Sequence, residues 1–174
     1  VGVFCTYTPW ELIEAADAAA VVLCGIGDDN IPIAETRLPQ NLCPLIKASY
    51  GAALADRCPF FYFSDLVVGE TTCDGKKKMY EMLADFKPVH VVELPNCQTE
   101  DGIQLYKKEL LRFKKVLEDK FETTITDEAV LHQIKLRNGI NKALRRLQYV
   151  MANDPAPVNG LDVINTVYGS GFDI

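Results

Sequence analysis

The chain has 174 residues, of which 48% are hydrophobic and 24% are charged, a composition typical of one globular domain with a substantial apolar core. No apolar run approaches the roughly 20 residues that a membrane-spanning helix needs, so we expect no membrane association. The formal net charge of -6 argues against a nucleic-acid-binding protein, which usually presents a basic surface.

The amino-terminal part of the chain alternates short apolar runs with helical patterns. Strands are predicted at residues 1–5, 20–25, 65–70 and 89–94. Helices are predicted between them, at residues 9–19, 43–57 and 74–86. A loop with one helical turn is expected at residues 27–41. Strands that alternate with helices indicate an α/β fold: a parallel four-stranded sheet flanked by helices (Rossmann- or flavodoxin-like), followed by long C-terminal helices.

Two long amphipathic helices are predicted after the sheet. Apolar residues recur every three or four positions from Ile103 to Phe121, and again from Leu136 to Met151. Thr126, followed by two acids, is a typical start for the second helix. We therefore expect an α/β domain, a helical extension packed on it, and a linker with the start of a further domain, at residues 1–100, 101–152 and 153–174. Because the chain lacks an initial methionine, it is expected to be an N-terminal fragment of a longer protein.

Six cysteines are the main chemical feature of the sequence: Cys5, Cys24, Cys43, Cys58, Cys73 and Cys97. There is no secretory signal pattern, so a cytoplasmic protein is expected and metal or redox use is favoured over disulfides. Four of the six follow or end predicted strands. Because the carboxyl ends of parallel strands meet at one edge, where ligands usually bind, these thiols are expected to gather there.

Cys73, within "GETTCDGKKKMYE", and Cys43, directly before Pro44, lie at predicted helix N-termini. Unpaired N–H groups and the helix dipole favour a thiolate at such positions, and thiolates are the ligands of iron–sulfur clusters. The two cysteines therefore form a candidate half-site for a cluster.

Other interpretations stay open at this stage. Any one of the cysteines could be a buried core thiol, since free cysteine is among the most buried residue types. A Cys–His nucleophile would need His90 or His132, and neither is placed near Cys73 by the pattern. No CxxC, GxGxxG or P-loop pattern occurs, which argues against structural zinc and nucleotide binding. The three lysines 76–78 are either a solvated helix face or a docking site for an acidic or phosphorylated partner.

Three segments carry a family resemblance: "FCTYTPWELIEAADAA", "LPQNLCPLIKASYGAAL" and "SDLVVGETTCDGKKKMYEML". Together they resemble the 2-hydroxyacyl-CoA dehydratase D-component family (2-hydroxyglutaryl-CoA dehydratase-like), and within it the branch of double-cubane cluster proteins. "KPVHVVELPNCQ", "YKKELLRFKKVLE" and "ITDEAVLHQIKLRN" follow in the order expected for the family. The resemblance extends from residue 1 to about residue 150.

The resemblance implies an oxygen-sensitive iron–sulfur enzyme with two α/β domains per subunit, acting as a homodimer or heterodimer. An ATP-hydrolysing iron–sulfur activator protein would supply single electrons. In the dehydratases, the reduced enzyme forms a ketyl radical from an acyl-CoA thioester and expels the hydroxyl group. In the double-cubane branch, two linked cubanes reduce small molecules.

Residue by residue, the resemblance implies that Cys43 and Cys73 ligate iron. Cys24 and Cys58 stand where the double-cubane branch tends to have cysteines and are expected to serve a second cubane. Cys5 matches a frequent family cysteine with a weaker claim as a ligand. Cys97 has no counterpart and is interpreted as structural. The remaining ligands are expected in a second domain, so that a [4Fe–4S] or double-cubane cluster would be incomplete or absent in this chain alone.

The sequence thus supports three hypotheses. The first is the N-terminal domain of an ATP-activated, low-potential iron–sulfur reductase of this family, inactive as an isolated fragment. The second is a true 2-hydroxyacyl-CoA dehydratase subunit. The third is a non-catalytic α/β binding or scaffold domain whose cysteines are structural. No individual catalytic residue, and no particular substrate, is predicted.

Overall fold

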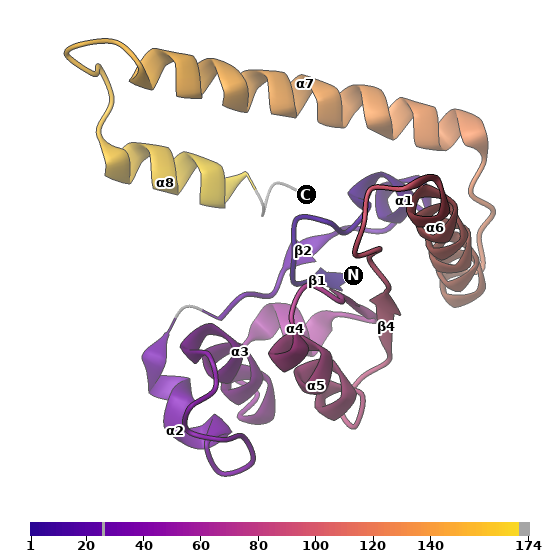
Figure 1. Ribbon diagram of the computed structural model, residues 1–174, viewed down its shortest axis with the longest axis vertical. Helices are drawn as coiled ribbons and strands as arrows, with labels where there is room; N and C mark the ends of the chain where they lie inside the picture. Colours follow the sequence, from indigo (N-terminus) through magenta and orange to yellow (C-terminus); the bar gives the residue numbers. More distant parts are fainter. Residues whose placement is uncertain (26, 171–174) are drawn as a thin grey trace.

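The computed structural model describes residues 1–25 and 27–170 and confirms the α/β class. Its strands are all parallel and form one sheet in the order β2-β1-β3-β4 (Figure 1). They are β1 (Gly2–Val3), β2 (Val21–Val22), β3 (Val67–Glu70) and β4 (Val89–Val92). Strand β2 lies on one side of β1, and the next strand in the sequence, β3, lies on the other side of β1. The strand order therefore reverses between β1 and β3, the point at which such sheets open a crevice at their carboxyl ends.

Successive residues of β3 show how the sheet is buried on both faces. Val67 packs into one apolar cluster and Val68 into the other, and both are fully buried. This follows from the two-residue period of a strand, which sends alternate side chains to opposite faces. Continuous apolar runs such as "DLVV" are typical of strands in this position.

One face of the sheet is covered by α1 (Trp10–Ala15) and α6 (Glu100–Phe121). Ile13 of α1 and Phe113 and Leu117 of α6 are fully buried against the strands. Helix α6 begins at Thr99, whose hydroxyl accepts a hydrogen bond from the Gly102 N–H at 3.2 Å. Capping of this kind satisfies one of the backbone donors left free at a helix start.

The other face is covered by a second group of helices. These are η1 (Asp28–Asn30), α2 (Ile31–Ala34), α3 (Pro44–Leu54), α4 (Pro59–Phe63) and α5 (Asp74–Leu83). Tyr50 of α3 and Met79, Tyr80 and Leu83 of α5 form the centre of this layer, and each is at most 1% exposed. The helical turn expected within residues 27–41 is present as η1 and α2.

The last two helices extend from this core (Figure 1). Helix α7 (Asp127–Met151) is anchored on α1 through Arg137, which pairs with Glu14 and lies 4.2 Å from the centre of the Trp10 ring. Helix α8 (Gly160–Gly169) occupies much of the predicted segment 153–174, of which residues 171–174 lie outside the described part. In the described residues, every helix is too short or too polar to cross a membrane.

The first two strands are shorter than predicted. β1 ends at Val3 and β2 at Val22, so that Cys5 and Cys24 lie two residues past the regular pairing. The Leu23 N–H still donates to the Val3 carbonyl at 2.8 Å, after which the two chains diverge. Both cysteines therefore lie on loops at the carboxyl edge of the sheet, where each side chain is half-buried.

Candidate functional site

The loop that follows β1 is fixed at the crevice between β1 and β3. At its start, the Lys76 ammonium donates to the Phe4 carbonyl at 3.1 Å. At its end, the Thr8 hydroxyl donates to the Oε1 of Glu70, the last residue of β3. These two contacts join pairs of residues that are 62 positions (Thr8 and Glu70) and 72 positions (Phe4 and Lys76) apart in the sequence. Both pairs meet at the topological switch point of the sheet.

Glu70 is fully buried, which is rare for a carboxyl group without a paired cation. Burial raises the pKa of this carboxyl, and the Thr8 hydrogen bond and the Lys76 charge partly oppose that rise. Its second oxygen, Oε2, has no hydrogen-bond partner within the described residues. Glu70 is therefore a desolvated acid held beside a cation at the centre of the site.

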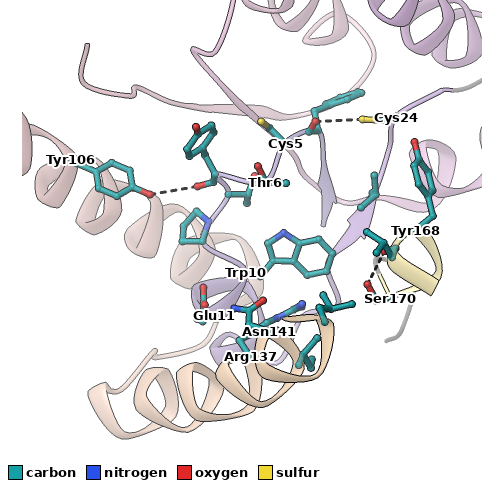
Figure 2. A pocket seen from close by; sticks show the side chains of 18 residues that line it. Cys5, Thr6, Trp10, Glu11, Cys24, Tyr106, Arg137, Asn141, Tyr168 and Ser170 are labelled. Carbon is teal, nitrogen blue, oxygen red and sulfur yellow. Dashed lines mark hydrogen bonds between the residues drawn. The ribbon is translucent and has the colours of Figure 1, made fainter. Parts of the chain in front are cut away.

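Cys5 and Cys24 lie on neighbouring loops and line the same cavity, of about 690 Å³ (Figure 2). The Cys24 thiol donates to the Phe4 carbonyl at 3.4 Å. Burial raises the pKa of this thiol, Lys76 opposes the rise, and Cys5 and Glu70 add to it. The expected gathering of thiols at this edge is thus seen for these two cysteines, which lie close enough to affect each other electrostatically.

Cys73 is the N-cap of α5 and is exposed. Its sulfur accepts a hydrogen bond from the Lys76 N–H at 3.4 Å. The pKa of the nearby Tyr80 hydroxyl is raised, mainly by burial. Glu70, Cys5 and Cys73 of the same site add to this rise. The position predicted for Cys73, after a parallel strand and at a helix start, is confirmed.

Cys43 occupies the equivalent N-cap of α3 and is also exposed. The starts of α3 and α5 are in direct contact at Gly75, where the close approach leaves no room for a side chain. A Cβ added at Gly75 would lie 2.7 Å from Ile46 Cδ1 and 3.0 Å from Leu42 Cδ1. The two helix N-termini that carry Cys43 and Cys73 are therefore neighbours.

The other two cysteines differ: Cys58 lies outside the carboxyl edge, whereas Cys97 lies in the loop after β4, as predicted. Cys58 is the N-cap of α4, its sulfur accepts from the Phe61 N–H at 3.4 Å, and it packs on the core. It follows the carboxyl end of α3, a helix of 11 residues that spans about 16 Å at 1.5 Å per residue, whereas Cys43 precedes that helix. Cys97 is exposed in the loop before α6, with its sulfur 3.4 Å from the Thr99 hydroxyl.

All six cysteines are free thiols. Within residues 1–25 and 27–170, no three side chains among histidine, cysteine, aspartate and glutamate are arranged so that they could hold a metal ion. The carboxyl edge of the sheet thus offers several thiols in one neighbourhood without forming a closed coordination site.

The three lysines at the start of α5 have different environments. Lys77 pairs with Asp74 at 2.7 Å and Lys78 with Glu81 at 2.9 Å, both on the exposed helix surface. Lys76 instead reaches back to the sheet edge, where it bonds the Phe4 carbonyl. The solvated-face interpretation therefore fits two of the three lysines, and the third belongs to the site.

His90 lies on β4, where its ring stacks on Phe113 of α6 at 5.1 Å between centroids. Burial, with Arg112, lowers the pKa of this imidazole, while Glu109 opposes the shift. The imidazole faces α6. Among the described residues, no thiol is seen to contact it, so a pair of His90 with a cysteine has no support here.

A second cavity, of about 470 Å³, adjoins the first. Tyr7 and Tyr106 line both, and the Tyr106 hydroxyl donates to the Tyr7 carbonyl at 3.4 Å. Thr71 and Thr72, which precede Cys73, contribute hydroxyls to the second cavity. The loop after β1 thus separates two hollows at the sheet edge.

Glu70 and Thr8 were not singled out by the sequence as site residues, and Lys76 was considered only as one of three lysines on a helix face or docking site. A signal for Glu70 was present, since a carboxylate ends an otherwise apolar buried strand, "DLVVGE". Nothing in the sequence pairs Thr8 with Glu70, because that contact depends on the path of the loop after β1.

These features define a parallel α/β protein with a thiol-lined crevice at its switch point. The chain matches the family described as 2-hydroxyglutaryl-CoA dehydratase, D-component, over residues 5–173. It belongs to that family, as its sequence motifs predicted. A relative from Escherichia coli (strain K12), named "Putative dehydratase subunit YjiM", is 49% identical over 173 residues. The match covers 99% of this chain and 45% of that protein, so the chain spans less than half the length of the relative.

Proposed function

We propose that this chain is the thiolate-bearing domain of an iron–sulfur enzyme of the 2-hydroxyacyl-CoA dehydratase family, with Cys43 and Cys73 as iron ligands. One observation carries the proposal: these two exposed thiols cap neighbouring helices, α3 and α5, at the carboxyl edge of the parallel sheet. Contact between Gly75 and the start of α3 keeps the two caps together.

The donor set fits such a cluster in its chemistry. Iron–sulfur clusters are held by cysteine thiolates, and hydrogen bonds to the sulfurs adjust their potential. Cys73 already accepts an N–H bond from the first turn of α5. A helix N-terminus, with its partial positive charge, also lowers the cost of a thiolate. Both cysteines are exposed, so a cluster could reach them without rearrangement of the core.

Cys5 and Cys24 are candidates for further thiolate ligands, since they lie at the same edge and line one cavity. Cys58 remains a predicted ligand of a second cubane, although it lies at the opposite end of α3 from Cys43. The described residues do not complete a coordination site. We therefore propose that the missing ligands come from outside this chain, consistent with a relative more than twice as long.

When bound, the cluster would supply low-potential single electrons. The chain's own residues would hold the thiolates, through the helix caps of Cys43 and Cys73, and shape the adjoining hollow with Trp10 and Tyr106. Glu70 would hold the Thr8 end of the loop after β1 beside Lys76. The proposed partners are an ATP-hydrolysing iron–sulfur activator and a second subunit, and the proposed setting is the cytoplasm under anaerobic conditions.

We propose reduction of a small molecule as the activity of the complete protein. Dehydration of a 2-hydroxyacyl-CoA is the second candidate, and the names of the family and of the Escherichia coli relative favour it. The two candidates share the thiolate site and differ in substrate. A non-catalytic binding or scaffold domain remains the alternative outside this chemistry.

Anaerobic reconstitution of the complete protein that carries this chain, with iron and sulfide, tests the proposal. We expect Cys43→Ser and Cys73→Ser to lose most of the bound iron, because each removes one thiolate. Cys97→Ser is the matched control, since Cys97 is equally an exposed thiol beside a helix start but lies in the loop before α6. Iron content that is the same in all three variants would contradict the assignment of the ligands.

The iron count and the substrate then separate the candidates. About eight irons per subunit indicate a double cubane and about four a single [4Fe–4S] cluster. Turnover of a 2-hydroxyacyl-CoA thioester with activator and ATP would establish the dehydratase. A wild-type protein that binds no iron under these conditions leaves the scaffold alternative.

A further inference from the structure

The segment between Phe4 and Thr8 carries Cys5 and forms a wall of the larger cavity. It has no regular secondary structure, yet both of its ends are bonded to the β3–α5 unit. Lys76 holds the Phe4 carbonyl, and Glu70 holds the Thr8 hydroxyl. The Phe4 carbonyl also accepts from the Cys24 thiol. One short loop therefore connects the positions of three cysteines: Cys5, Cys24 and, through α5, Cys73.

We propose that Glu70 and Lys76 form a two-point clamp that positions Cys5 and Cys24 relative to Cys73 at the switch point. This inference rests on the proposed function for its purpose, since the thiols are positioned for a cluster. The clamp itself is a property of the chain and can be tested without iron. Glu70 and Lys76 are positioning residues, because they act on the thiols through the loop.

The burial of the groups supports the clamp at its Glu70 end. Glu70 is fully buried and Thr8 is 5% exposed, so this hydrogen bond is shielded from water. Breaking it would leave both polar groups without a partner in an apolar setting, which is far more costly than losing a surface hydrogen bond. The Thr8 end of the loop is therefore strongly fixed to β3.

The Lys76 end is held differently. The Lys76 side chain leaves the first turn of α5, the turn capped by Cys73, and crosses to the loop after β1. Its charge lies near both Glu70 and Cys24, since it affects the pKa of each. Lys76 thus couples the helix that presents Cys73 directly to the backbone that presents Cys5.

The first test measures the alkylation rates of individual cysteines in this chain, prepared without iron, by peptide mass spectrometry. Lys76→Met should raise the rate of Cys5 by about three- to tenfold, because the loop opens more often. Cys24 is not used as a readout, because Lys76 also lowers the pKa of its thiol, so its reactivity would change without any opening of the loop. Lys78→Met is the matched control, since the partner of Lys78 within residues 1–25 and 27–170 is Glu81, on the exposed helix surface. Cys97, which is exposed and lies in the loop before α6, serves as the internal reference.

A second pair of variants tests the other end of the clamp. Thr8→Val removes the hydroxyl at nearly constant volume and should raise the Cys5 rate by a similar factor. Thr8→Ser keeps the hydroxyl and should restore the wild-type rate. If Thr8→Val fails to fold, Lys76→Met still decides the matter. An unchanged Cys5 rate in Lys76→Met, with Cys97 constant, would overturn the clamp.

The two proposals fail in distinguishable ways. In the reconstituted complete protein, Lys76→Met should alter the electron paramagnetic resonance signature of the cluster, whereas Lys78→Met should not. Faster Cys5 alkylation in Lys76→Met, combined with a wild-type protein that binds no iron, would uphold the clamp and remove its proposed purpose. Normal iron binding with unchanged alkylation would uphold the cluster and overturn the clamp.

Discussion

At the scale of single residues, the site is dominated by a buried acid rather than by its thiols. Glu70 has one oxygen bonded to Thr8 and the other without a partner within the described residues. A buried, half-satisfied carboxyl group costs folding free energy unless it is neutral or paired. Lys76 provides partial compensation through its charge. Such a costly arrangement is typical of functional positions, where stability is given up for geometry.

The pH dependence of stability should reveal Glu70. Its pKa is raised above the unfolded value of 4.5, so the folded protein keeps this proton to higher pH than the unfolded chain does. The contribution of this proton to the unfolding free energy is complete below pH 4.5 and is lost as pH rises through the pKa of the folded protein. Its size is about 1.4 kcal/mol for each tenfold difference in proton affinity between the folded and unfolded states. Urea unfolding of wild type and Glu70→Gln between pH 4 and pH 8 measures it.

Wild type and Glu70→Gln share every titrating group except Glu70, so the difference between them isolates the titration of this one residue. The variant also keeps a side-chain oxygen that can accept the hydrogen bond from Thr8. We expect the difference in unfolding free energy between variant and wild type to grow in favour of the variant as pH rises. A difference that is constant with pH would show that Glu70 titrates normally.

At the scale of elements, the contact between β3 and α5 sets the position of Cys73. Gly69 allows the Tyr80 ring to lie directly on the strand: a Cβ there would be 2.4 Å from two ring carbons. Tyr80 is itself fixed by burial and by a tilted contact with Phe4, with 5.7 Å between ring centroids. The glycine in "VVGETTC" therefore has a packing reason.

Gly69→Ala should destabilise the protein by about 1–3 kcal/mol, because the buried Tyr80 ring cannot move aside without disturbing the core. Gly139→Ala is the opposite case. It lies within α7, where an added Cβ would meet no described atom within 4 Å apart from its chain neighbours and the backbone of its own helix, and it should gain about 0.5–1 kcal/mol from helix propensity. Thermal and urea unfolding of both variants measure the effect, and equal stabilities would contradict the packing argument.

Helix α7 depends on few anchors, since none of its residues is fully buried. Arg137 combines an ion pair with Glu14 and a stacked contact with Trp10, both partly shielded from solvent. Arg137→Ala should cost about 1–2 kcal/mol and increase hydrogen exchange in α1 and α7. Arg145→Ala, an exposed position on the same helix, should change neither. If the two variants exchange alike, α7 is held by other contacts.

The elements were predictable where their pattern was long. The strand at 65–70, the helix at 74–86 and the two long helices correspond to β3, α5, α6 and α7 within a few residues. Helix α4 (Pro59–Phe63) was not predicted, because a five-residue aromatic segment is too short to show a helical period. Its start is fixed locally, by Pro59 and the Cys58 cap.

The site was predictable to the extent that topology alone decides it. Parallel strands place Cys5, Cys24 and Cys73 at one edge, and proline or an acid after the cysteine marks the helix starts of Cys43 and Cys73. The Glu70–Thr8 and Lys76–Phe4 contacts could not be predicted. Both contacts depend on the path of the chain between Val3 and α1. That path is set by strand pairing and side-chain packing in the folded protein.

At the scale of the whole molecule, the apolar surface is unevenly distributed. Helices α4 and α6 expose a few of their large apolar side chains, whereas α7 and α8 bury none of theirs fully and expose many. The most exposed on these helices are Leu131 (55%), Leu136 (52%), Tyr149 (76%), Leu161 (65%) and Ile164 (60%). Monomeric proteins rarely expose so much apolar surface, and such surface promotes association.

The chain as it stands should therefore self-associate with rising concentration, and charges on α8 should suppress this. In Leu161→Glu/Ile164→Glu, two exposed apolar residues become acidic on a protein that already carries a net charge of -6. We expect the weight-average mass in sedimentation equilibrium to fall toward the monomer, because apolar burial is lost and like charges repel. The unfolding free energy should change by less than about 0.5 kcal/mol, since both positions are on the surface.

Ile103→Glu is the matched control, because Ile103 is 59% exposed but lies on α6 rather than on α7 or α8. It should leave the self-association nearly unchanged. Equal suppression by Ile103→Glu would mean that net charge, rather than the apolar surface of α8, controls association. A double variant that sediments like the wild type at every concentration would show that α8 takes no part in it.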